Sequence, residues 1–123
     1  MLSVTKIVKF DAAHYLPNHE GKCKNLHGHT WKVEIKVSGQ MEAGIIIDFT
    51  DLKKVINHAI LEKLDHSCLN DLGEASAYLS NPTAENLCLW ISQQMVKPLT
   101  RYSTRVIRVR VWESEDSYAE WIE

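Results

Sequence analysis

The sequence predicts an α+β domain in which two helices cover one face of an antiparallel sheet. Two N-terminal segments alternate polar and apolar residues, two central segments repeat apolar residues at helical spacing, and two C-terminal segments alternate again. Helices grouped between two pairs of strands favour a sheet with both helices on one face. No repeat, low-complexity tract or linker interrupts the 123 residues, so one domain spanning residues 1–123 is expected.

The two N-terminal strands are separated by a polar loop, from Leu16 to Asn25. The first strand is expected from Val4 to His14, where the residues of one parity are mostly apolar and end at a histidine. The second strand has the cleaner alternation, because lysines and a glutamate occupy one face. The other face carries His27, His29, Trp31, Val33, Ile35 and Val37. Such alternation is typical of an antiparallel strand with one buried and one solvated face.

Two helices are expected in the middle of the chain. Asp48 or Thr50 is suited to cap the first helix. Its apolar residues at helical spacing are Leu52, Val55, Ile56, Ala59, Ile60 and Leu64. Residues 67–82 are loop-like, and the second helix is expected to begin near Thr83 and to end at Pro98. The predicted element order is therefore ββααββ once the C-terminal strands are added.

The C-terminal strands are expected at Arg105–Glu113 and Tyr118–Ile122, joined by a hairpin. The inward parity of the first comprises Ile107, Val109, Val111 and Glu113. A buried carboxylate needs hydrogen-bond donors, and a ligand with an amidine- or guanidine-like edge supplies two in parallel. The alternative for Glu113 is a solvated position just past the strand end. Arg108 and Arg110 mostly point away from the inward face, so no triphosphate site is evident.

Composition excludes several functional classes. The formal net charge is -2, which argues against nucleic acid or an anionic membrane as the main partner. No apolar run has the length of a signal peptide or of a membrane span. Three widely spaced cysteines give no disulfide framework, so a reducing, cytoplasmic location is expected.

Three histidines are predicted to meet at one end of the sheet. His27 and His29 project from the same face of one strand, with Cα atoms roughly 6.6 Å apart. His14 ends the preceding strand, so an antiparallel pairing places it beside them. Three neutral imidazoles leave an open position on a bound ion, which is typical of a zinc site that polarises an oxygen or activates water. His19 and His58 lie outside this group and are expected at the surface.

Two further features are candidates for acid–base chemistry. Cys23 lies four residues before the histidine pair, as either a fourth metal ligand or a thiolate that acts on a metal-bound molecule. Asp65 and His66 follow the last apolar residue of the first helix. They form either an acid–base pair or a histidine that complements the helix dipole. Cys68 and Cys88 are expected to be structural thiols.

These features together resemble the 6-pyruvoyltetrahydropterin synthase family, in particular its prokaryotic branch of 6-carboxytetrahydropterin synthases. The most specific element is a cysteine followed four residues later by His-Gly-His, with a further histidine on the strand before. The matching segments are FDAAH (10–14), CKNLHGH (23–29), IIDF (46–49), LDH (64–66), NPTAEN (81–86) and VWES (111–114).

The resemblance implies a tunnelling fold, in which four-stranded antiparallel sheets from several subunits join into a barrel. It implies a homo-oligomer, usually a hexamer, with active sites at subunit interfaces. Carried over by motif, the implied roles are zinc ligands (His14, His27, His29), a catalytic thiol (Cys23), its acid–base partner from a neighbouring subunit (Asp65, His66), a pterin anchor (Glu113) and a further pterin contact (Thr83).

The implied activity is a zinc-dependent lyase reaction on a small molecule, 7,8-dihydroneopterin triphosphate. The products would be 6-carboxy-5,6,7,8-tetrahydropterin, acetaldehyde and triphosphate, for 7-deazaguanine (queuosine) biosynthesis. The pyruvoyl-forming enzymes of the biopterin branch share the ligands and the thiol, so that reaction is the alternative. A side-chain-cleaving branch lacks this thiol, and Cys23 therefore disfavours it.

Three other functions remain open on the residues alone. A closed site of three histidines and a cysteine would give a zinc-stabilised, non-catalytic module. A pterin-binding protein would use Glu113 without turning its ligand over. A metal hydrolase would use zinc-bound water and would not need Cys23.

Overall fold

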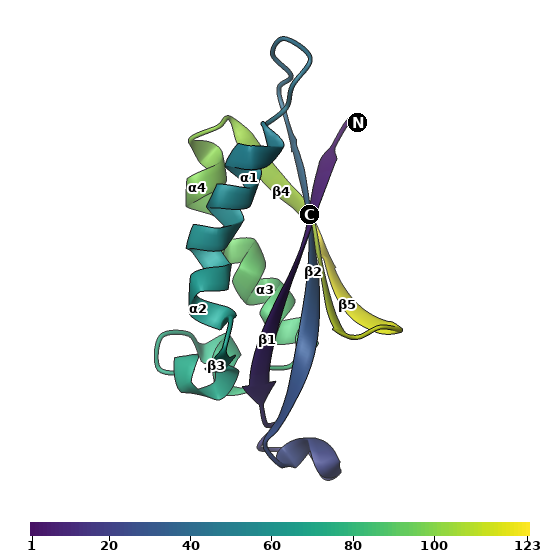
Figure 1. Cartoon of the computed structure of the whole chain (residues 1–123), viewed down its shortest axis with the longest axis vertical. Coiled ribbons are helices and arrows are strands. Elements are labelled where there is room, and N and C mark those ends of the chain that lie inside the picture. Colours follow the sequence, from purple (N-terminus) through teal and green to yellow (C-terminus); the bar gives the residue numbers. More distant parts are fainter.

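The computed structural model describes all residues from Met1 to Glu123. Its centre is one five-stranded sheet with strand order β3-β1-β2-β4-β5, and the helices lie on one side of it (Figure 1). The strands are β1 (Val4–His14), β2 (His27–Gly39), β3 (Ser67–Cys68), β4 (Thr104–Ser114) and β5 (Ser117–Ile122). The predicted α+β class, the four main strands and the one-sided helical layer are confirmed.

The prediction of a purely antiparallel, four-stranded sheet is wrong at one edge. β3 pairs in parallel with β1, through Ala12 with Ser67 and Ala13 with Cys68. A strand of two residues has no periodicity, so residues 67–82 read as a loop. Besides β3, this segment forms two short 3-10 helices, η3 (Leu69–Leu72) and η4 (Ala77–Ser80).

Two helical rods form the layer over the sheet. The first runs through α1 (Phe49–Ile56), a π-helical segment η2 (Asn57–Leu61) and α2 (Glu62–Leu64). Of the two candidate caps, Asp48 caps this rod, because its Oδ1 accepts a hydrogen bond from the Thr50 N–H at 2.7 Å.

The second rod consists of α3 (Ala84–Gln94) and α4 (Val96–Thr100). As predicted, this helix begins near Thr83, and the structure shows that the Thr83 side chain caps it. The expectation that Pro98 ends the helix is wrong. The ladder already breaks at Met95, and Pro98 lies in the first turn of α4, where its missing N–H has no intrahelical partner to lose.

The core lies between the helices and the inward face of β2. Trp31, Val33, Ile35 and Val37 have no exposed surface, and they pack with helical residues such as Leu87. Full burial of one such side chain contributes about 1.5–3 kcal/mol. The other face of the sheet has no helix over it (Figure 1), and the paired strands β2 and β4 place Lys32, Glu34, Lys36, Arg108 and Arg110 on it.

One predicted inward residue is displaced by a β-bulge. Lys36 pairs with Arg108 and Val37 with Val106, so Ile107 is the extra residue between them. The bulge reverses which residues face inward in the part of β4 before Ile107, so Val106 is buried in place of Ile107. Val109 and Val111 remain on the inward face, and β4 continues to Glu113.

The antiparallel register of β1 and β2 places the histidines. His14 pairs with His27, and Ala12 pairs with His29. One end of the sheet therefore carries all three imidazoles on the inward face, beyond the apolar core. No helix of the structure is long and apolar enough to span a membrane.

Candidate metal centre

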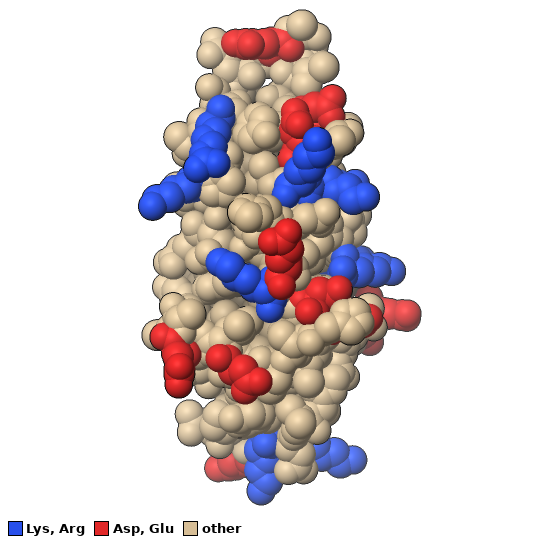
Figure 2. Space-filling view, turned by 60° about the vertical axis from the view of Figure 1, so that its left-hand side comes forward, with Lys and Arg blue, Asp and Glu red and all other residues tan.

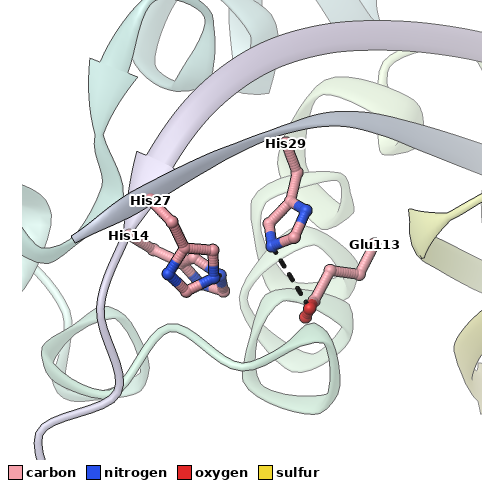
Figure 3. A group of neighbouring side chains, drawn as sticks. All are labelled: His14, His27, His29 and Glu113. Atoms are coloured by element: carbon pink, nitrogen blue, oxygen red, sulfur yellow. Dashed lines mark hydrogen bonds and ion pairs between the residues drawn. The ribbon is translucent and has the colours of Figure 1, made fainter. Parts of the chain in front are cut away.

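The three predicted imidazoles converge at the end of the sheet (Figure 3). The ring centroid of His14 lies 4.6 Å from that of His27 and 5.1 Å from that of His29. The centroids of His27 and His29 are 4.8 Å apart. One potential ligand atom from each ring, together with an oxygen of Glu113, falls within a cluster no wider than 4.8 Å.

Two of the imidazoles have their Nδ1 atoms committed to backbone carbonyls. His14 Nδ1 donates to the Pro82 carbonyl at 2.8 Å, and His27 Nδ1 donates to the Asn25 carbonyl at 2.7 Å. In the neutral rings, both Nε2 atoms are then acceptors, yet they lie 3.1 Å apart. Two facing acceptors gain nothing from each other, whereas tetrahedral zinc with bonds of about 2.0–2.1 Å separates its ligands by about 3.3 Å. The donor set fits a cation between these atoms.

His29 supplies a third unsatisfied nitrogen. Its Nε2 is buried and has no hydrogen-bond partner, although Glu113 Oε1 lies 3.3 Å away, near enough for an ion pair. A buried polar nitrogen without a hydrogen-bond partner costs free energy unless something binds it. The three Nε2 atoms therefore meet the requirements for a metal site with three histidine ligands.

Trp31 supports the cluster from the core side. Its indole contacts the rings of His14 and His29 edge-on, at centroid distances of 4.9 and 5.4 Å. The Trp31 Nε1–H donates to the Ala12 carbonyl at 3.3 Å, which fixes the indole. Packing thus helps to hold His14 and His29 in place, and His14 is held by its hydrogen bond to Pro82 as well.

Burial keeps two of the imidazoles neutral. Desolvation is the main cause that lowers the pKa of His14 and of His29 below their ordinary value of 6.5. The nearby Glu113 carboxylate acts in the opposite direction, toward a higher pKa, and is the smaller effect. Neutral imidazoles are the form that binds a metal ion.

The metal-free protein is therefore expected to lose stability in acid. Above 6.5 these two histidines are neutral in both the folded and unfolded chains; as the pH falls below 6.5 the unfolded chain takes up protons first, so folding becomes less favourable. Urea midpoints at about pH 7.5 and about pH 5.5 measure this, and zinc affinity should fall over the same window. An affinity that is equal at both values would exclude imidazole ligands.

The carbonyls of Pro82 and Asn25 are functional groups that the sequence analysis missed. Pro82 belongs to the NPTAEN segment, which turns just before α3 and faces the end of β1. Thr83 Oγ1 accepts from the Asn86 N–H at 3.0 Å, and Asn86 Nδ2 donates to the Asn81 carbonyl at 2.8 Å. The segment therefore holds the carbonyl that orients His14. The available signal was that this segment is one of those that resemble the family.

Glu113 lies at the mouth of the cluster, on β4. Its side chain is 32% exposed, so one edge of the carboxylate faces solvent while Oε1 contacts His29. The inward direction agrees with the strand parity. Its contact with a metal-ligand candidate was not foreseen from the sequence.

Cys23 lies in a 3-10 helix, η1 (Lys22–Lys24), within the loop between β1 and β2. A hydrogen bond joins the two ends of this loop, because the Leu16 N–H donates to the Cys23 carbonyl at 2.8 Å. The thiol is half-buried and is not part of the histidine cluster, whose fourth member is Glu113.

Asp65 and His66 form a close pair at the edge of the sheet. His66 Nδ1 lies 3.0 Å from Asp65 Oδ2. The backbone of Asp11 clamps both residues: its N–H donates to Asp65 Oδ1 at 3.0 Å, and its carbonyl accepts from the His66 N–H at 2.7 Å. The first of these bonds is the main cause that lowers the pKa of Asp65. His66 has φ of 59°, a left-handed conformation that these contacts sustain.

His66 faces an open pocket of about 450 Å³. The pocket wall includes Asp11, Gly28 and Thr30, which have the opposite strand parity to the metal-ligand candidates, and also His29, which is one of those candidates. No cluster in the structure unites His66 with Cys23. Within one chain, the acid–base pair and the predicted thiol are separate features.

The two remaining cysteines are unpaired, as predicted. Cys88 packs inside α3, and burial raises the pKa of its thiol to about 11. It is therefore protonated at neutral pH, which confirms its assignment to the core. Cys68 is half-buried in β3.

Comparison with known proteins agrees with the fold and with the motifs. The sequence model of the 6-pyruvoyl tetrahydropterin synthase family matches residues 3–123. A relative from Archaeoglobus fulgidus, named provisionally as a 6-carboxy-5,6,7,8-tetrahydropterin synthase, is 42% identical over 112 residues, covering 90% of this chain and 87% of its own. Several further relatives carry the carboxy name without that qualification.

Two other similarities complete the comparison. A dihydroneopterin monophosphate aldolase from Pyrococcus furiosus is 37% identical over 107 residues, covering 87% of this chain and 85% of its own. The solved structure of Caenorhabditis elegans 6-pyruvoyl tetrahydropterin synthase superposes with a TM-score of 0.82 at 21% identity, covering 99% of this chain and 95% of that one. The chain belongs to the 6-pyruvoyl tetrahydropterin synthase family.

Proposed function

We propose that the protein is a zinc-dependent 6-carboxy-5,6,7,8-tetrahydropterin synthase. It would convert 7,8-dihydroneopterin triphosphate to the carboxypterin, acetaldehyde and triphosphate, in 7-deazaguanine biosynthesis in the cytoplasm. The observation that carries the proposal is the set of three imidazole Nε2 atoms without hydrogen-bond donors at the end of the sheet. The relatives that carry the carboxy name support the choice of reaction.

His14, His27 and His29 would hold the zinc. When bound, zinc supplies Lewis acidity that polarises the side-chain oxygens of the pterin and acidifies the neighbouring C–H bonds. The Cys23 thiolate would accept a proton from the side-chain carbon. His66 would return a proton through Nε2, because its Nδ1 is held by Asp65.

We propose that the working site is assembled between subunits. Cys23 and the Asp65–His66 pair lie in no common cluster within one chain, which supports donation of the pair from a neighbouring copy. The uncovered sheet face carries charged residues of β2 and β4, such as Glu34, Arg108 and Arg110, as the inside of a barrel of joined sheets would. A homo-oligomer, by resemblance a hexamer, would then be required for activity.

Glu113 would bind the amino-pyrimidinone edge of the pterin. Exchange for glutamine, Glu113→Gln, keeps the size of the side chain but removes the charge that pairs with two donors. KM is expected to rise about tenfold or more while zinc content stays unchanged, because a charged hydrogen-bonded pair contributes about 1.5–3 kcal/mol. Steady-state kinetics with zinc analysis measures both quantities. Loss of zinc from this variant would instead make Glu113 a metal ligand.

Thr83 would make a further polar contact to the pterin. Its oxygen already accepts the capping hydrogen bond from Asn86, so the hydroxyl hydrogen is the part available to a ligand. This assignment rests on the resemblance and on the place of Thr83 beside Pro82, whose carbonyl orients His14.

Product analysis tests the proposal. The zinc-loaded protein should be incubated with 7,8-dihydroneopterin triphosphate and its products identified by mass spectrometry. Carboxytetrahydropterin with acetaldehyde is the expected result. A pyruvoyl product would show that the protein catalyses the alternative, pyruvoyl-forming reaction. Absence of turnover by a zinc-loaded oligomer would refute the proposal that the protein is an enzyme.

A further inference from the structure

A groove in the helical layer gathers positive charge that the proposed reaction does not use. It lies between the α1–η2–α2 rod and the α3–α4 rod and encloses about 590 Å³. Small-molecule sites commonly measure ~300–1,000 Å³. Neither the histidine cluster nor the Asp65–His66 pair contributes to its walls, so the groove is separate from the proposed active site.

The charged residues of the groove are mostly cations. Lys54 comes from α1, Lys63 from α2 and Lys97 from α4, and Arg101 follows directly after α4. Glu62 is the one carboxylate among the lining residues. The groove therefore carries a net charge of +3 in a chain whose formal net charge is -2. The view of the helical face in Figure 2 shows lysine and arginine side chains spread over this layer, with acidic ones between them.

The cations of the groove lack partners of opposite charge. Arg105, Arg108 and Arg110 all form ion pairs with glutamates, but Arg101 forms none. The three groove lysines also form none, and Glu62 instead contacts the His58 ring at 3.3 Å. Like charges that line one concavity repel each other, and a bound anion removes that repulsion.

The shape of the groove leaves room for a ligand among these charges. The π-helical segment η2 forms part of one wall, through His58 and Ala59, and the short side chains of Ala59 and Pro98 keep the space open. Single π-helical turns are found frequently at functional sites. Tyr102 lies at the end near Arg101 and adds an aromatic surface.

We propose that this groove binds a polyphosphate anion, either inorganic triphosphate or the phosphate chain of a nucleotide. Four separated cations match a ligand with several charged oxygens along a chain better than they match a single carboxylate. The site would be distinct from the proposed pterin site, so its occupancy can be measured with the full zinc-loaded protein.

Lysine acetylation followed by peptide mass mapping locates the ligand directly. Acetylation rates are compared without ligand and with about 1 mM inorganic triphosphate or ATP, probes suited to weak binding. Lys54 and Lys97 should be protected at least about threefold. The acetylation rate of Lys53, which is exposed on α1 beside Lys54 but lies outside the groove, should not change. Protection by ATP alone would identify a nucleotide, and protection by both probes would identify the phosphate chain as sufficient.

A paired substitution provides the second readout. Lys97→Ala with Arg101→Ala changes exposed side chains and should weaken binding by about tenfold, while Lys53→Ala should leave the dissociation constant unchanged. Turnover of dihydroneopterin triphosphate should be normal in all three proteins at low salt. The proposal is wrong if neither probe protects Lys54 and Lys97, or if Lys53 is protected equally.

Discussion

Exchange of Cys23 for alanine is expected to abolish most of the activity while the protein keeps its zinc and its fold. The thiol is half-buried in the loop between β1 and β2 and is not part of the histidine cluster, so its removal leaves the metal ligands intact. A proton-transferring group contributes typically about 10²–10⁴-fold to a rate. Turnover should fall by that factor, measured by product formation at saturating substrate, with zinc quantified in the same sample.

Cys68→Ala is the matched control, because Cys68 is also a half-buried, unpaired thiol. It should be fully active. Normal turnover by Cys23→Ala would contradict the thiolate role and favour a hydrolase that uses metal-bound water. Loss of zinc from Cys23→Ala would favour the non-catalytic module with a closed site.

Exchange of His27 for alanine is expected to remove the metal. His27 supplies one of the three unsatisfied Nε2 atoms, and its Nδ1 is held by the Asn25 carbonyl. Loss of a group that only hydrogen-bonds to a metal ligand costs about 10–100-fold in metal affinity, so loss of the ligand itself should lower the affinity by more than about 100-fold. At a zinc concentration about 100 times the dissociation constant, the parent protein gains about 2.7 kcal/mol of stability. The variant should gain almost none, as measured by thermal unfolding with and without zinc.

His58→Ala is the control for this variant, because His58 is an exposed histidine outside the cluster. Its zinc-dependent stabilisation should equal that of the parent protein. Full zinc content in His27→Ala at stoichiometric metal would contradict the proposed ligand set.

The parts of the fold that sequence could predict are those with long, regular patterns. The alternation from His27 to Val37 was sufficient to place β2. It also predicted that three histidines meet, because antiparallel pairing brings the end of β1 beside the start of β2. Thr83 was predictable as a helix start because a cap needs a local side chain. The elements themselves depend on patterns among neighbouring residues, and the meeting of the histidines adds only the pairing of two strands that are consecutive in the chain.

The features that were missed depend on distant partners. β3 exists because Ser67 and Cys68 reach the edge of β1, and two residues carry no pattern. The bulge at Ile107 depends on how β4 fits against β2. The carbonyl of Pro82 orients His14 across 68 residues of sequence, and backbone carbonyls leave no mark on residue identity. The contact of Glu113 with His29 was also missed because it joins residues that are far apart in the sequence.

X-ray absorption at the zinc edge of the purified protein would show directly whether three histidines bind the metal. We expect three nitrogen ligands at about 2.0–2.1 Å, completed by oxygen and with no sulfur. The spectrum should be the same for Cys23→Ala, because the thiol is not a ligand. A zinc–sulfur distance of about 2.3 Å, or fewer than three imidazole nitrogens, would contradict it.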